Sequence, residues 1–162
     1  MRGHRRKTDT VAGIRPRHSV PHNERKAELM SQSIQPKDWA PARGYSNGML
    51  MDDGTLHVSG QIGWDKNKNL VKGGFIPQME QALKNITDVV AAAGGEIRDI
   101  GRLTWFVRDK SEYAEKQKEV GQAYQRVFGK HFPAMSMVVI TELIEDEAVV
   151  EIEATAYIKS KL

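Results

Sequence analysis

The chain has 162 residues, which fits one domain and a tail, and its 40% hydrophobic and 28% charged residues are typical of a globular protein. It has no cysteine, which excludes disulfides and thiolate chemistry, and no apolar run near the roughly 18 residues of a membrane span. The net charge of +3 arises in residues 1–29, which hold eight basic and three acidic residues, so the remainder has 16 basic against 18 acidic residues. We therefore expect a cytoplasmic protein without a membrane segment, for which nucleic acid is a poor candidate partner.

Residues 1–40 are predicted to form a poorly ordered tail before a single domain at 41–160, because they contain several prolines and few large apolar residues. Three interpretations of residues 1–29 remain open. They are a start codon assigned too early, with translation beginning at Met30, a disordered basic extension, or an organellar targeting peptide. Targeting is the weakest, because the segment contains acids and lacks an amphipathic stripe.

The domain is expected to begin with a β-hairpin, because "DDG" at 52–54 separates the short apolar runs 49–51 and 55–59. A helix follows within residues 73–95. Its apolar residues recur at spacings of three and four, and Gly94 and Gly95 provide a stop signal. These residues are Ile76, Met79, Leu83, Ile86, Val90 and Ala93.

The second half predicts a strand at 102–107, a helix capped by Ser111 and ended by Gly129, and strands within 134–143 and 148–158. The resulting order, ββαβαββ, predicts an α+β fold with a mixed, mostly antiparallel sheet and two helices on one face. Several strands carry large apolar groups on both sides. The face without helices is therefore expected to be buried in a homo-oligomer.

Glu151 and Glu153 form a candidate site, because residues two apart on a strand project from the same face. One interpretation is a solvated strand face. The other is that one carboxylate orients a water or accepts a proton.

Other candidates are weaker. Gly60, in "VSGQIG" at 58–63, permits close approach of a ligand to the backbone, although such strand ends are usually turns. Tyr45 either lines a pocket or packs against neighbouring side chains without a role in binding. The five histidines lack the spacing of metal ligands, so no metal is expected.

Five segments in order carry a resemblance to a known family: "GYS" at 44, "HVSGQI" at 57, "QALKNITDVVAAAGG" at 81, "FPA" at 132 and "VEIEATA" at 150. Together they resemble the Rid family, also called YjgF-type. The resemblance covers about residues 41–158. It implies a chorismate-mutase-like fold, assembly as a homotrimer, and clefts between neighbouring subunits that bind a small molecule.

The resemblance also implies a reaction without a cofactor, in which reactive enamines and imines are hydrolysed to keto acids and ammonia. By position, Tyr45 matches the pocket tyrosine, Ser59 and Gly60 match the ligand wall, and Glu151 matches the glutamate associated with the water.

The family pattern "PAR-S" places an arginine against the substrate carboxylate, but here Met135 stands at that position, followed by Ser136. Methionine offers no charge. Arg43 is a candidate replacement, although an arginine at a tail boundary is more often solvated. The alternative is a less anionic or more apolar ligand, for which Met135 is a soft wall.

Two functions follow as hypotheses. The first is a Rid-like hydrolase of reactive enamine or imine intermediates, with a substrate that differs from that of the arginine-bearing members. The second is a non-catalytic trimeric module that binds a small metabolite in the clefts between subunits. Glu151 favours the first and Met135 the second. Nucleic-acid binding rests only on the basic tail and ranks last.

Overall fold

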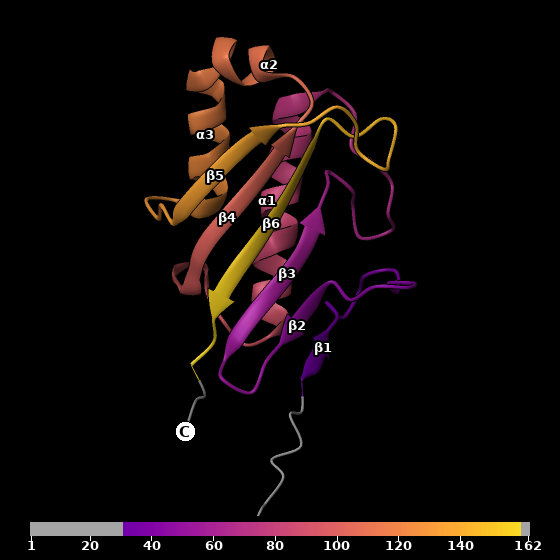
Figure 1. Ribbon diagram of the computed structural model, residues 1–162, viewed down its shortest axis with the longest axis vertical. Helices are drawn as coiled ribbons and strands as arrows, with labels where there is room; N and C mark the ends of the chain where they lie inside the picture. The colour runs from indigo at the N-terminus through magenta and orange to yellow at the C-terminus, as the bar shows by residue number, and fades with distance from the viewer. Residues whose placement is uncertain (1–30, 160–162) are drawn as a thin grey trace, which may run out of the picture.

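The computed structural model describes residues 31–159, and residues 1–30 and 160–162 lie outside the described part of the chain. Three strands come first, and helices and further strands follow them along the sequence (Figure 1). Their bounds are β1 Gln32–Ile34, β2 Gly48–Leu50, β3 Thr55–Gln61, α1 Phe75–Ala92, β4 Ile100–Val107, α2 Lys110–Glu115, α3 Gln117–Phe128, β5 Ala134–Val139 and β6 Val150–Tyr157, with a 3₁₀ turn at Ile97–Asp99.

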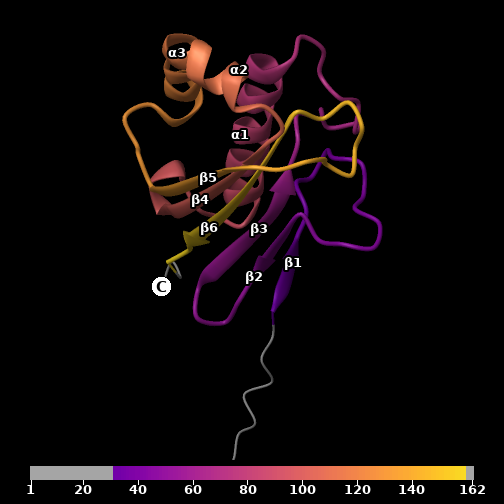
Figure 2. The same ribbon diagram turned by 45° about the horizontal axis from the view of Figure 1, so that its top comes forward.

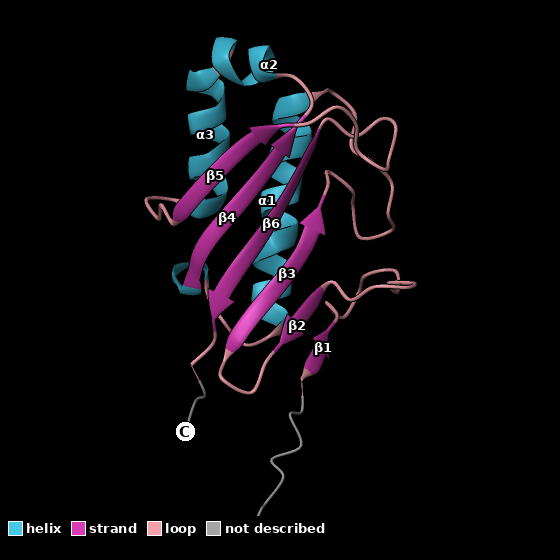
Figure 3. Ribbon diagram, in the orientation of Figure 1, coloured by secondary structure: helices cyan, strands magenta, loops and turns pink. Residues whose placement is uncertain are grey.

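One six-stranded sheet in the order β1-β2-β3-β6-β4-β5 forms the front layer of the molecule (Figure 3). Its pairings are antiparallel except that of β4 with β5, which is parallel. The helices lie behind the sheet, and the tilted view shows its opposite face without a helical cover (Figure 2). The predicted α+β class with a mixed, mostly antiparallel sheet is confirmed.

The core lies between the sheet and α1 and α3, and the central strand β6 shows how sequence alternation builds it. Val150, Ile152, Ala154 and Ala156 are buried on the helical side, as the pattern predicts. Glu151, Glu153 and the other intervening residues project to the opposite side, which we call the open face. Because successive strand residues alternate faces, burial of the apolar set fixes both glutamates on the open face.

Two turns that the sequence predicted are present. Gly54 closes the β2–β3 hairpin with φ 86°, and its N–H donates to the Met51 carbonyl at 2.9 Å. Gly94 ends α1 with φ 83°, a conformation that glycine adopts without a steric cost.

Three details of the sequence prediction are wrong. The predicted tail, residues 1–40, extends too far, because residues 32–34 form β1 at the sheet edge and Ile34 is buried in the core. The single helix predicted from Ser111 to Gly129 divides into α2 and α3 at Lys116, whose ψ of 24° leaves the helical region. The order is therefore βββαβααββ.

The cap of α2 also lies two residues earlier than the predicted Ser111. It is Asp109, whose carboxylate accepts hydrogen bonds from the Ser111 N–H at 2.8 Å and hydroxyl at 2.7 Å.

Candidate functional site

A carboxylate packed over a glycine forms the centre of the candidate site. Glu151 lies at the start of β6, and a Cβ built on Gly60 of β3 would lie 2.9 Å from its Cγ and 2.6 Å from its Cδ, with Oε1 closer still. With Glu151 in this position, only a residue without a side chain fits between the carboxylate and the β3 backbone. The structure therefore brings together the predicted residues Gly60 and Glu151.

The backbone of β3 is irregular at this point, which sets the position of its glycine. Val58 pairs with Ala154 and Gln61 with Ile152, so Ser59 and Gly60 together oppose the single residue Glu153. Such a bulge redirects side chains and is frequent beside functional sites. The Ser59 hydroxyl donates to the Asn47 carbonyl at 3.2 Å, which ties the bulge to the residue before β2.

The electrostatics of Glu151 differ from those of an exposed glutamate. Burial raises the pKa of the Glu151 carboxyl, and the negative charge of Glu153 on the same face raises this pKa further. A paired cation would lower this pKa, but no salt bridge involves Glu151 among residues 31–159. A carboxylate with a raised pKa is a stronger proton acceptor, as water activation requires.

An aromatic group that contains the predicted Tyr45 lies just beyond the same end of β3, after Gln61. The Tyr45 and Trp64 rings stack with their centroids 6.4 Å apart, and the Lys68 ammonium lies 3.0 Å from the Tyr45 hydroxyl. Lys68 Nζ is also 5.0 Å from the Tyr45 centroid and 5.4 Å from that of Trp64. These three residues form what we call the aromatic–lysine group.

A buried amide connects the two groups. Gln61 accepts a hydrogen bond from Trp64 Nε1 at 3.2 Å and donates through Nε2 to the Ser59 carbonyl and hydroxyl, both at 3.1 Å. Behind it, Asn85 of α1 donates to the carbonyls of Ile62 at 3.1 Å and Trp64 at 2.9 Å. Because buried polar groups need partners, these bonds hold the loop after β3 in one conformation.

The predicted residues of β5 do not join this arrangement within one chain. Met135 pairs with Leu103 and Ser136 with Thr104, so two strand spacings, about 10 Å, separate β5 from β6. Met135 shares the helical side of the sheet with the buried Leu103, although it is 44% exposed at the edge. A cleft holding both Met135 and Glu151 therefore requires two copies of the chain.

Arg43 lies in the loop before β2 and is exposed. In the described part of the chain it makes no hydrogen bond or ion pair.

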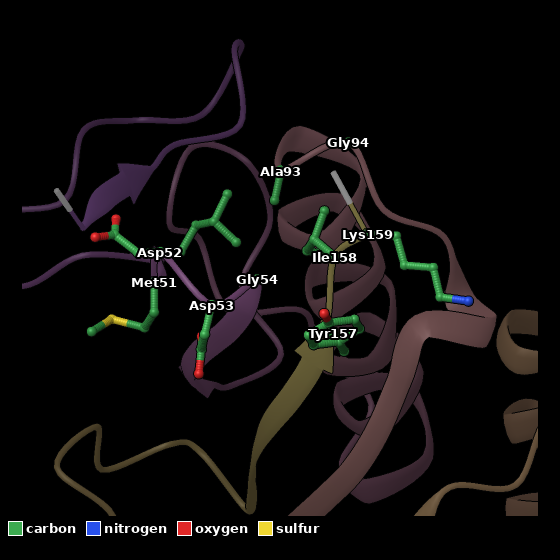
Figure 4. Close-up of a pocket in the computed structure, with 10 residues that line it drawn as sticks. Met51, Asp52, Asp53, Gly54, Ala93, Gly94, Tyr157, Ile158 and Lys159 are labelled. Carbon is green, nitrogen blue, oxygen red and sulfur yellow. The ribbon is translucent and has the colours of Figure 1, made fainter. Parts of the chain in front are cut away.

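Two cavities open near the sheet. One of about 340 Å³ lies on the open face, and its lining includes His57, Ser59, Glu153 and Thr155. Figure 4 shows another, of about 500 Å³, at the end of β6 far from Glu151, where Tyr157 lies beside the turn at Gly54. None of the predicted site residues lines the second cavity.

Residues 31–159 contain no helix long and apolar enough to cross a membrane. Within the same range, no three His, Asp or Glu side chains gather as a metal site.

The arrangement has known counterparts. Residues 35–158 match the family described as endoribonuclease L-PSP. The chain belongs to this family, the Rid family. Membership explains the mixed sheet backed by helices.

Individual Rid-family relatives cover most of the domain. The RutC family protein UK114 of Drosophila melanogaster is 37% identical over 130 residues, covering 80% of this chain and 88% of the relative. The human 2-iminobutanoate/2-iminopropanoate deaminase is 33% identical over 113 residues, covering 69% of this chain and 78% of the relative. The crystal structure of the Rid-family protein YyfA from Yersinia pestis has a TM-score of 0.68 at 32% identity, covering 80% of this chain and all of that one.

Four residues of this Rid-family site were missed from the sequence: Gln61, Trp64, Lys68 and Asn85. The sequence did not mark the two amides as buried. Alternation from Leu56 and Val58 places Gln61 on the open face, and only the bulge turns it inward, whereas Asn85 lies off the apolar stripe predicted for α1. No sequence pattern indicates that Trp64 and Lys68 meet Tyr45, which is about 20 residues earlier in the chain.

Proposed function

We propose that this chain is a cofactor-free hydrolase of reactive enamine or imine intermediates, which releases ammonia and leaves a keto acid. The observation that carries the proposal is the partly buried Glu151 carboxylate, packed over Gly60 and without a salt bridge in the described chain. Relatives named as 2-iminobutanoate/2-iminopropanoate deaminases support the reaction class. The proposed location is the cytoplasm.

The proposed reaction uses Glu151 as the proton acceptor. Water adds to the carbon of the protonated imine while one water proton passes to the Glu151 carboxylate, and the electron pair of the carbon–nitrogen double bond becomes the lone pair of an amine. Glu151 returns that proton to the nitrogen, and the carbon–nitrogen bond then breaks as the new hydroxyl gives its proton to the Glu151 carboxylate, so ammonia leaves and a carbonyl remains. General acid–base catalysis of this kind contributes about 10² to 10⁴-fold to a rate.

We propose a homotrimer as the working assembly. Two observations support an oligomer: Val138 and Val139 of the edge strand β5 are 45% and 56% exposed, and Met135 and Glu151 of one chain are separated by the width of two strand spacings. Exposed apolar residues on an edge strand favour burial against another copy.

The proposed substrate differs from that of arginine-bearing members, because Met135 cannot form a two-point pair with a carboxylate. A charge-assisted hydrogen bond is worth ~1.5 to 3 kcal/mol, so Met135→Arg should raise kcat/KM on a small imino acid by about ten to a hundredfold.

A second candidate function, favoured by Met135, is a trimeric module that binds a small metabolite without turning it over. One assay distinguishes the two: ammonia release from freshly generated 2-aminoacrylate and 2-iminobutanoate, with wild type, Glu151→Gln and the exposed control Glu119→Gln. The hydrolase predicts activity in wild type and the control and a loss of at least about 100-fold in Glu151→Gln. A folded wild type that releases no ammonia above the uncatalysed rate contradicts it and leaves the binding module.

A further inference from the structure

The loop between β3 and α1 is a closed turn that presents one lysine. Trp64 and Leu70 form an antiparallel bridge, and between them the Asp65 carboxylate accepts hydrogen bonds from the N–H groups of Asn67 at 2.8 Å and Asn69 at 2.9 Å. These bonds lower the pKa of Asp65, with the Asn69 N–H as the largest cause. The carboxylate thus remains ionised and holds the turn closed.

Lys68, at the tip of this turn, has an unusual backbone conformation. Its φ is +66°, and it is the one non-glycine residue with positive φ among residues 31–159. Its N–H donates to the Asp65 carbonyl at 2.9 Å. A left-handed conformation in a residue other than glycine costs about 1 kcal/mol or more, and such residues cluster at ligand clamps.

The side chain of Lys68 is held by neutral groups, so its charge remains available. Its ammonium contacts the Tyr45 hydroxyl and lies over the Tyr45 and Trp64 rings. No carboxylate of the described chain lies within 4.0 Å of it. Because an ammonium has three N–H donors and the hydroxyl accepts one, two remain for a ligand. The aromatic faces restrict the position of the cation without neutralising it.

The aromatic groups are themselves fixed from behind. Asn85, which is 1% exposed, holds the Trp64 carbonyl, and the fully buried Gln61 holds the Trp64 indole N–H. Gln61 also bonds Ser59, which precedes the glycine beneath Glu151. Hydrogen bonds and ring contacts therefore connect the cation to Ser59, the residue before the glycine on which Glu151 packs.

We propose that Lys68 is the anion-binding group of the cleft, and that the ligand keeps a carboxylate despite the loss of the arginine at position 135. The carboxylate binds the Lys68 ammonium beside the Tyr45 hydroxyl, on the β3 side of Glu151. The inference rests on the proposed function for the identity of the ligand as an imino or keto acid. Because one ammonium replaces a planar two-point guanidinium, the anchor is a single charge with less geometric selectivity.

The test compares Lys68→Met, Lys68→Arg and the control Lys66→Met, an exposed lysine of the same turn. Lysine and methionine experience the same backbone strain at positive φ, so both Met variants are expected to fold, and a thermal melt checks this. The probes are 2-oxobutanoate, a keto acid of the product class, and its neutral amide, 2-oxobutanamide. Affinity is measured by calorimetry or ligand-observed NMR, and KM and kcat are measured from ammonia release.

We expect Lys68→Met to weaken 2-oxobutanoate binding, and to raise KM, by about ten to a hundredfold with kcat within about twofold of wild type. Lys68→Arg retains most of the affinity, Lys66→Met matches wild type, and the affinity for the amide does not depend on Lys68. Equal affinity of wild type and Lys68→Met for 2-oxobutanoate overturns the inference. An equal loss in Lys66→Met also overturns it, because the effect is then general surface charge, and so does a wild type that binds no 2-oxobutanoate.

The outcomes separate this inference from the proposed function. A wild type that releases no ammonia but binds 2-oxobutanoate through Lys68 contradicts the hydrolase and supports the anion site. A wild type that hydrolyses imines with kinetics unaffected by Lys68→Met contradicts the anion site and supports the hydrolase.

Discussion

Replacing Gly60 by alanine tests whether the position of the Glu151 carboxylate matters for activity. The new Cβ would lie 2.6 Å from Glu151 Cδ and closer still to Oε1, while ordinary contact begins near 3.4 Å, so the carboxyl group must retreat by at least about 0.8 Å. Glu151 can comply, because its side chain is half-buried and flexible. A misplacement of about 1 Å costs about 100-fold in rate, so kcat for ammonia release should fall by about that factor.

The stability of Gly60→Ala should change little, because Gly60 does not adopt a positive φ. Lower conformational entropy of the unfolded chain stabilises by about 0.4 to 1 kcal/mol, which offsets part of the crowding. Gly101→Ala is the matched control: it also lies in a strand, and its new Cβ would meet only the Thr155 carbonyl oxygen, at 4.0 Å. Full kcat in a folded Gly60→Ala protein would refute the assignment of Glu151 as the proton acceptor.

Three further predictions concern pH and assembly. Glu153→Gln removes a charge that raises the pKa of Glu151, so the acidic limb of the kcat/KM profile should move to lower pH. Burial raises the pKa of Tyr124 from 10.0 to about 12. As the pH rises, the Tyr124 phenol therefore ionises at a lower pH in the unfolded chain than in the folded one. The free energy of unfolding should fall by about 2 kcal/mol between pH 10 and about pH 12, and Tyr124→Phe should not show this fall. Val138→Asp on β5 should dissociate the oligomer in light scattering, whereas Ile144→Asp, in a loop and 98% exposed, should not.

The fold could be predicted because burial enforces the sequence patterns on which the prediction depends. The alternation of β6 and the spacing of α1 place their apolar residues in one core, so a different register would expose them. β1 escaped prediction because three residues are too few to show a period. The break at Lys116 escaped because the apolar spacing continues through it.

The candidate site could be predicted only where a family pattern named its residues. Glu151 and Gly60 belong to such segments, and the structure adds that they touch. The aromatic–lysine group depends instead on a turn that returns Lys68 to Tyr45 from 23 positions later. Local propensity does not predict the contact between Lys68 and Tyr45. The contact forms because Asp65 closes the turn and Asn85 holds the turn against α1.

The position of the cation determines whether ligand binding depends on assembly. An arginine at position 135 would present its charge from β5, two strand spacings from Glu151. It could therefore bind the carboxylate of a ligand beside Glu151 only from a second chain. Lys68 belongs instead to the same chain as Ser59 and Gly60 and is connected to them through Gln61. Carboxylate binding through Lys68 should therefore persist in a monomeric variant, even if closure of the cleft, and with it catalysis, requires the neighbouring copy.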